Sequence, residues 1–316
     1  MNFEELCASY LEDIYVNVKE STYVRYRDMI HNHILPYLKT CSLEDVDLYM
    51  LEELKRQLLK RGRKDGKGGL SPKSVSDILS LLKNIIYYGQ NHDLNIACRP
   101  ECLKVRREGR EMRVLSPEEQ KQLCLHLTKH MNRTNMGILL ALHTGLRIGE
   151  LCGLTWENVD LESGWIKIVV TIQRIPRESA SIGKNRRKTH LVITQPKSSS
   201  SCRWIPVPEP LLPLLITFRT KPEDYLLSGL DTPVEPRTLQ NRFMAVMRQT
   251  DIKGATFHTL RHTFATRCVE SGFEIKSLSE ILGHASVNIT LNRYVHSSLE
   301  LKKKNMKKMD AYLRSL

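Results

Sequence analysis

Apolar residues recur at the spacing of an α-helix from residue 3 to residue 95, and this repeat most limits what the chain can fold into. Helices are expected over about 3–14, 21–38 and 43–61, and a basic, glycine-rich loop follows at 62–69. Ser71 and Pro72 then form the start of another helix, the serine as its cap and the proline at its first position. The pattern predicts a small helical bundle.

The repeat stops at residues 99–113, which hold six Arg or Lys, three Glu and little that could form a core. We interpret this segment as a basic linker between a helical domain at 1–98 and a second domain at 114–316, whose tail helix starts at about 299. In the second domain, helical patterns surround segments rich in β-branched residues, which predict strands at 165–172, 190–194 and 203–207. The expected fold is mainly α with a small antiparallel β-sheet.

The charge of the chain favours a polyanionic partner. The formal net charge is +13 and the isoelectric point about 9.4, so the field of the protein attracts phosphate groups. The sequence has no apolar run long enough to span a bilayer, and no membrane partner is expected. The eight cysteines are scattered and lack zinc-ribbon spacing, so we expect reduced thiols in a cytoplasm and no structural metal.

Four short runs contain side chains that suit phosphate chemistry. Arg147 and Glu150 share one face of a short helix, while His258 and Arg261 share a face of another. His284 follows a helix that ends at Gly283, and Tyr294 lies on the next helix among polar neighbours. Lys197 lies in a basic turn, residues 196–203, expected to join two strands as a hairpin.

Each run alone has an ordinary interpretation: a surface ion pair, a core helix, a core tyrosine or a basic turn. His258 and His262 also have the spacing of helical metal ligands, but no Glu follows His258, so the metalloprotease pattern is absent.

Together, the two Arg, two His, one Lys and one Tyr form a set suited to cleaving a phosphodiester. Two guanidinium groups can each form paired hydrogen bonds with the nonbridging oxygens of a phosphate. A tyrosine hydroxyl has a pKa of about 10 and is a weak nucleophile unless a base such as histidine assists it. The leaving 5′ oxygen needs a proton, which a lysine on a mobile turn can supply.

The motifs T-G-L-R-I-G-E-L at 144–151, H-T-L-R-H-T-F-A-T at 258–266, L-G-H-A-S at 282–286 and R-Y-V-H at 293–296 occur in this order. In this combination the chain resembles the tyrosine recombinase and integrase family, which includes phage and conjugative-transposon integrases. The resemblance covers essentially the whole chain. It implies a helical core-binding domain and a catalytic domain that form a clamp around DNA.

The resemblance also implies roles for individual residues. Arg147 and Arg261 would bind the scissile phosphate, His284 would donate a hydrogen bond to it, and Glu150 would support the active-site arginine. Tyr294 would attack, leaving a 3′-phosphotyrosyl link, while His258 would act as general base and acid. Lys197, in a turn that matches the family's P-K-x-x-S-S-x-R pattern, would protonate the leaving oxygen, with Lys184 and Lys188 as lesser candidates.

Further basic residues are expected to contact the DNA backbone. They are Arg25, Arg27, Arg63, Lys64, Lys67, Lys73, Arg106, Arg107, Arg186, Arg187 and Lys188.

The implied activity is site-specific recombination that integrates or excises a mobile element through a Holliday junction, without a cofactor. The implied partners are duplex recombination sites, three further copies of the chain in a tetramer whose C-terminal tails pack in trans, and a directionality factor or host DNA-bending protein. Many mobile-element integrases have an additional N-terminal arm-binding domain, which we expect to be absent or removed here because the first helix is expected to start at residue 3. The alternatives are a type IB topoisomerase and a noncatalytic DNA-binding protein of the same fold.

Overall fold

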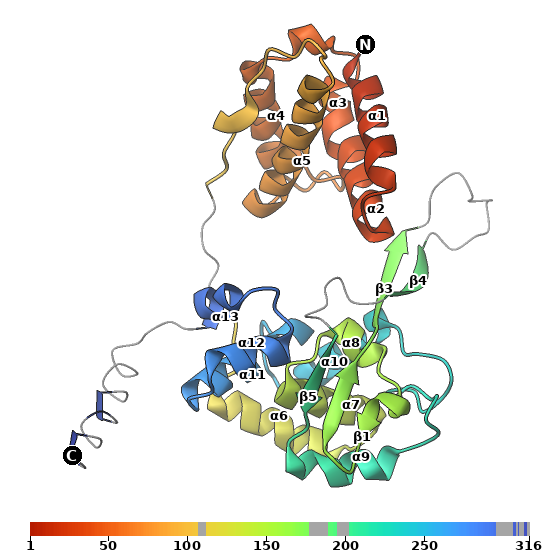
Figure 1. The fold of residues 1–316 in the computed structure, drawn as a ribbon, viewed down its shortest axis with the longest axis vertical. Helices are drawn as coiled ribbons and strands as arrows, with labels where there is room; N and C mark the ends of the chain where they lie inside the picture. The colour runs from red at the N-terminus through yellow and green to blue at the C-terminus, as the bar shows by residue number, and fades with distance from the viewer. Residues whose placement is uncertain are drawn as a thin grey trace. The chain divides into compact units, whose positions relative to one another are not determined.

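The computed structural model describes residues 1–106, 112–176, 189–194 and 202–294, together with 306, 307, 309, 313 and 314 of the C-terminal tail. The chain divides into two compact units, shown in Figure 1. One comprises residues 1–110 with 175–188, and the other comprises residues 111–174 with 189–316. No helix within the described residues is both long enough and apolar enough to cross a membrane.

The first unit is the expected helical bundle. Its helices are α1 (Phe3–Tyr15), α2 (Glu20–Met29), α3 (Leu35–Leu38), α4 (Leu48–Arg61) and α5 (Pro72–Asn91). Helix α5 has the predicted serine cap, since the Ser71 side chain accepts a hydrogen bond from the backbone of Ser74. The apolar faces of these helices bury one continuous core.

Two helix boundaries in this unit differ from the sequence prediction. The expected helix at 21–38 is interrupted by a π-helical turn, Ile30–Ile34, just before Pro36. Proline has no amide hydrogen to continue the α-helical pattern, which accounts for the change. The expected helix at 43–61 begins only at Leu48, because the Asp47 side chain caps it by accepting from the backbone of Met50.

The charged segment after α5 contributes more to the core than its composition predicted. Pro100 is buried in a short 3-10 turn, Pro100–Cys102, and Leu103 is buried in the core of the first unit.

The second unit is mainly helical with small antiparallel sheets. Its helices are α6 (Pro117–Lys129), α7 (Arg133–Thr144), α8 (Ile148–Cys152), α9 (Leu212–Phe218), α10 (Pro236–Gln249), α11 (Phe257–Glu270), α12 (Ile275–Leu282) and α13 (Val287–Tyr294). Helix α7 is buried along most of its length and contacts α6, α8, α9, α10 and α11, so it forms the centre of this unit (Figure 1).

The strands are β1 (Val159–Asp160), β2 (Trp165–Ile168), β3 (Thr171–Pro176), β4 (Thr189–Thr194) and β5 (Arg203–Pro206). Strand β2 lies between β1 and β5 in one sheet, with Ile166 opposite Ile205, while β3 and β4 form a second sheet. The single strand predicted at 165–172 is therefore two strands. The predicted hairpin around Lys197 is also wrong, because β4 and β5 belong to different sheets.

Candidate active site

Two glycines end the helices that frame the site. Gly145 follows α7 and Gly283 follows α12, and both have left-handed backbone, with φ of 69° and 63°. A Cβ atom on Gly145 would lie 2.7 Å from Cδ1 of Phe264, and one on Gly283 would lie 2.9 Å from a terminal nitrogen of Arg203. Only glycine combines this conformation with such close approach.

Three arginines bind the C-terminal end of α12. The guanidinium of Arg203 donates to the carbonyl of Ile281 at 2.6 Å, that of Arg261 to Leu282 at 2.5 Å, and that of Arg147 to Gly283 at 3.1 Å. The last carbonyls of a helix have no partner within it and carry partial negative charge, so they favour cations. Residues from α11, β5 and the start of α8 are thus brought together at one helix end.

Glu150 holds two of these arginines in place. Its carboxylate accepts from Arg147 at 2.7 Å and forms two 2.9 Å hydrogen bonds with Arg203. Burial raises the pKa of Glu150, but the hydrogen bonds and charges of Arg203 and Arg147 outweigh burial and lower it to about 2. The ordinary interpretation of this run, a surface ion pair, therefore fails at Glu150, whose carboxylate is buried between two arginines.

Arg203 was missed as a site residue by sequence reasoning. The available signal was its place in β5, where burial alternates and Arg203 shares the inward face with Ile205. An arginine on the buried face of a strand requires a partner of opposite charge.

The two predicted phosphate-binding arginines differ in exposure. Arg147 is 36% exposed, whereas Arg261 is 1% exposed and also donates to the carbonyl of Gly145 at 2.8 Å. Burial and the neighbouring Arg147 lower the pKa of Arg261 to about 9, which still leaves it charged at neutral pH. Binding of a phosphate to Arg261 would require the side chains around it to move.

Tyr294 is buried at the end of α13, although its neighbours in the sequence are polar. It is 5% exposed and belongs to a small apolar cluster with Ala265, Cys268, Leu278 and Leu282. Burial raises the pKa of its phenol, against the opposing effect of charges that include Arg261 and Arg147. The phenol is therefore protonated at rest and lies within the field of both arginines.

Histidines surround the phenol. Nδ1 of His262 is 2.9 Å from the Tyr294 oxygen, and the His284 ring lies parallel to the Tyr294 ring with 6.3 Å between centroids. His284 is itself held by a 2.8 Å hydrogen bond to Thr290 on α13. The ring of His258 packs edge-on against His262 with 4.3 Å between centroids. His262 is the second site residue that sequence reasoning missed, although its position next to Arg261 and one turn after His258 was visible.

These histidines are neutral at pH 7. Burial, followed by nearby positive charge, lowers the pKa of His258 and His262 to about 4 and that of His284 to about 3. Each ring therefore has one nitrogen that can accept a proton or a hydrogen bond.

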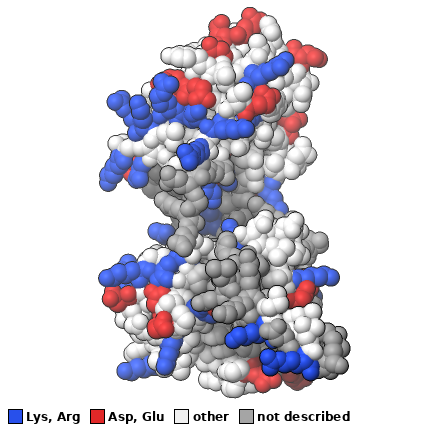
Figure 2. Space-filling model, turned by 90° about the vertical axis from the view of Figure 1, so that its left-hand side faces the viewer, with Lys and Arg blue, Asp and Glu red and all other residues white. Residues whose placement is uncertain are grey.

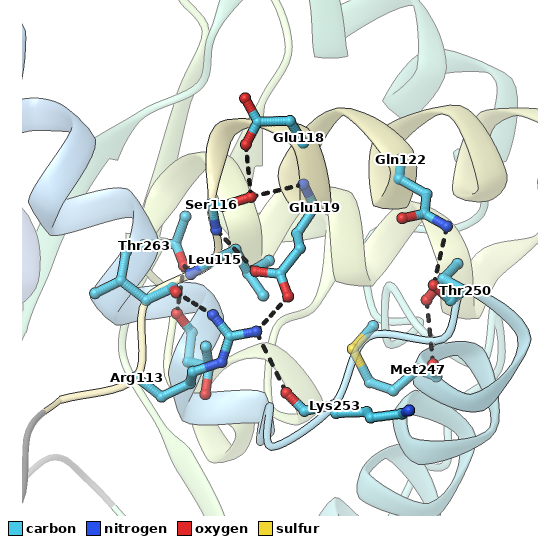
Figure 3. A network of polar contacts seen from close by, with 12 residues as sticks. Arg113, Leu115, Ser116, Glu118, Glu119, Gln122, Met247, Thr250, Lys253 and Thr263 are labelled. Carbon is cyan, nitrogen blue, oxygen red and sulfur yellow. Dashed lines mark hydrogen bonds and ion pairs between the residues drawn. The ribbon is translucent and has the colours of Figure 1, made fainter.

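The start of the second unit fixes α11, the helix that carries His258, Arg261 and His262. The backbone of Leu115 donates to Thr263 at 3.0 Å, and Arg113 binds Glu119 and the carbonyl of Lys253 (Figure 3). Thr263 is fully buried. The segment before α6 is thus tied to α11 through Thr263 and to the loop before α11 through Lys253, so the site rests on a supported helix.

Several predicted residues lie outside the described part of the chain. They are Lys197, Lys184, Arg107, Arg186, Arg187, Lys188 and most of the tail after 299.

The other predicted DNA contacts belong to the first unit, and Figure 2 shows basic side chains, with acidic ones among them, on the visible surface of that unit. Lys64, Lys67, Lys73 and Arg106 are exposed. Arg25 and Arg63 are also exposed but pair with Asp77 and Asp65, each at 2.6 Å, while Arg27 is 17% exposed and pairs with Asp28 at 3.4 Å. Arg63 and Lys64 line a surface hollow of about 470 Å³ with His33 and Ser71.

The site defines a class of protein. Preorganised guanidinium groups bind anions, and a tyrosine held beside neutral histidines supplies a nucleophile, which together suit transfer of a phosphodiester to tyrosine.

The chain belongs to the phage integrase family. The family's profile matches residues 113–300, more than half of the chain, and the profile of the phage integrase N-terminal SAM-like domain matches residues 2–47. It is a site-specific tyrosine recombinase, and the predicted resemblance is confirmed.

Named relatives and solved structures agree. The chain is 26% identical to a tyrosine recombinase XerC-like protein of Caldanaerobacter subterraneus, over 90% of this chain and 76% of the relative. It is 23% identical to the ICEBs1 integrase of Bacillus subtilis, over 99% and 84%.

The Tn1549 transposon integrase in complex with transposon right end DNA has the same fold, with a TM-score of 0.79 and 23% identity over 98% of this chain and 100% of that one. A lambda integrase dimer bound to a COC′ core site gives a TM-score of 0.68 at 16% identity, over 95% and 97%. These likenesses confirm the predicted fold class.

Proposed function

We propose that Tyr294 is the nucleophile that cleaves one strand of a duplex recombination site. The observation that carries this proposal is the position of its phenol, buried beside the arginine cluster with its oxygen hydrogen-bonded to a neutral histidine. Attack on phosphorus forms a 3′-phosphotyrosyl link and releases a 5′ hydroxyl. The link conserves the energy of the phosphodiester, so rejoining needs no ATP.

The arginines and His284 are proposed to bind the scissile phosphate. Arg147 is open to solvent and already oriented by Glu150 and Gly283, so part of the ordering cost is met before DNA binds. Arg261 would join it after the surrounding side chains rearrange. His258 is proposed to take part in proton transfer, and Lys197 to protonate the leaving 5′ oxygen.

The protein is proposed to act as a tetramer on DNA of a mobile element, with C-terminal tails packed in trans. The excess of positive charge supports a DNA backbone contact. The lambda integrase tetramer bound to a Holliday junction has a related fold, with a TM-score of 0.66, which supports the same assembly here.

The test uses duplexes with a randomised core, from which wild-type protein selects its own site by forming a denaturant-resistant adduct. Nicked versions of the captured duplex then trap the covalent intermediate. Tyr294→Phe is expected to bind this DNA and form no adduct. Tyr37→Phe, which changes an exposed tyrosine of the first unit, is the control and should form adduct as the wild type does. An adduct formed by Tyr294→Phe would refute the assignment.

A further inference from the structure

The hydroxyl of Tyr294 has a histidine partner, and that partner is not the histidine expected from the sequence. Nδ1 of His262 lies 2.9 Å from the phenol oxygen. The ring of His258 instead packs edge-on against the ring of His262. His262 lies on α11 and Tyr294 at the end of α13, so the hydrogen bond joins two helices that also pack together.

We propose that His262 is a further residue of the cleavage reaction: it positions the Tyr294 hydroxyl and accepts its proton when the phenol attacks. The inference deepens the proposed function and rests on Tyr294 being the nucleophile. Nδ1 touches the reacting oxygen directly, so His262 meets the geometric requirement for a general base, a donor–acceptor distance of about 2.6–3.2 Å.

The direction of the hydrogen bond follows from the acidities of the two groups. A phenol O–H is a much stronger acid than the N–H of a neutral imidazole, so the stronger bond has the phenol as donor and Nδ1 as acceptor. Burial raises the pKa of Tyr294 and lowers that of His262 to about 4, so both groups are neutral at rest. The ring proton of His262 is then on Nε2.

The charges around His262 connect proton transfer to DNA binding. The groups that act on it are His258 and Arg261 on α11 and Arg293 on α13, and the positive charges disfavour a protonated imidazole. A bound phosphate anion offsets these charges and makes protonation of His262 less costly. The base therefore becomes stronger when the phosphodiester is in place.

The atoms balance in both directions. In cleavage, the phenol O–H bond breaks and its proton moves to Nδ1, the new O–P bond forms, the P–O5′ bond breaks, and the 5′ oxygen takes a proton from Lys197 as proposed above. In rejoining, the 5′ hydroxyl attacks phosphorus, its proton returns to the lysine, and the tyrosine oxygen leaves and recovers its proton from His262.

The test compares adduct formation by full-length variants on the captured, nicked duplex. His262→Asn keeps a polar atom near the Nδ1 position but has no basic nitrogen, and it should lower the cleavage rate by at least about 100-fold. His262→Ala should be similarly slow, and added imidazole should restore part of its rate. His126→Asn is the matched control, because His126, on α6, also contacts the ring of a histidine one turn away and hydrogen-bonds a side chain.

A second measurement does not depend on how a histidine variant folds. Nitrogen NMR of wild-type protein labelled at histidine, without DNA, should show His262 with an unprotonated Nδ1 whose signal shifts in Tyr294→Phe. The inference is overturned if His262→Asn cleaves within about threefold of the wild type, if it cleaves faster, if imidazole gives no rescue, or if Nδ1 carries the ring proton. Adduct formation by Tyr294→Phe would instead refute the proposed function itself.

Discussion

At the scale of single residues, the site is a set of groups whose hydrogen bonds are formed before any substrate arrives, with three arginines around one carboxylate and so an excess of positive charge. Glu150 is 4% exposed and satisfies two guanidinium groups, and the end of α12 satisfies three. A buried charge that loses its partner is costly, so the stability of this cluster and its ability to bind phosphate depend on the same contacts.

Glu150→Gln should destabilise the protein, because it leaves the buried Arg203 charge without its partner. We expect the free energy of unfolding of the second unit to fall by about 3–5 kcal/mol, as measured by urea denaturation. Glu280→Gln, an exposed change on α12, is the control and should cost less than about 0.5 kcal/mol.

The same carboxylate makes stability depend on pH. Its pKa falls from 4.5 to about 2 on folding, so the unfolded chain binds a proton more tightly than the folded one. Its contribution is fully present above pH 4.5 and is lost as pH falls toward 2. The stability difference between wild type and Glu150→Gln should therefore shrink over this window; a difference independent of pH would contradict the assigned cause.

Arg147→Ala should lower the rate of adduct formation by about 100–1000-fold, the usual loss for one preorganised donor to a transition state. DNA affinity should change little by comparison, because most backbone contacts remain. Arg242→Ala, which removes an arginine bound to Thr134 on α7, serves as control. Equal losses of cleavage and binding in Arg147→Ala would argue that this residue only helps to hold DNA.

At the scale of elements, two helix ends and one short helix bring the site together. Helix α12 presents its last carbonyls to the arginines, α7 ends at Gly145 beside Arg261, and α13 places Tyr294 against α11. The left-handed glycines that end α7 and α12 are required by the backbone conformation of these helix ends more than by the chemistry of the site.

Gly145→Ala tests this requirement. A left-handed alanine costs about 1–2 kcal/mol, and its Cβ would also lie 2.7 Å from Phe264 and 2.9 Å from Leu282. Gly254→Ala is the matched control, since Gly254 has φ of 70° and nothing within 4 Å of a Cβ. In denaturant unfolding, Gly145→Ala should lose more stability than Gly254→Ala by about 1–3 kcal/mol, the usual cost of overpacking. Equal losses would show that the surroundings of Gly145 adapt.

The sequence predicted most elements but only part of the site. The serine cap located the start of α5 and the glycine located the end of α12, because these signals act within a few residues of the chain. The break between β2 and β3 and the pairing of β5 with β2 depend on tertiary contacts, which no local pattern records. The same holds for Arg203 and His262, whose roles arise from partners 53 and 32 residues away.

At the scale of the whole molecule, charge and family agree. The excess of 13 positive charges suits a protein that holds a polyanion, and membership of the phage integrase family identifies that polyanion as DNA. Sequence composition was sufficient to predict a polyanionic partner, because long-range electrostatics depends mainly on net charge and little on detailed geometry.

DNA binding should weaken steeply as salt rises, with the logarithm of affinity falling linearly with the logarithm of salt concentration. Lys64→Ala should reduce the slope by about 0.9 if this lysine contacts one phosphate, as measured by fluorescence anisotropy of the captured duplex. Lys253→Ala, an exposed lysine that pairs with Asp251, is expected to leave the slope unchanged. An unchanged slope in Lys64→Ala would remove this residue from the proposed interface.

The most direct measurement is the identity of the amino acid that carries the DNA. Wild-type protein is trapped on its captured duplex, both polymers are digested, and the joined peptide and nucleotide are sequenced by mass spectrometry. We expect a peptide containing Tyr294 joined through its oxygen to a 3′ phosphate. A linkage at another side chain, or to a 5′ phosphate, would contradict it.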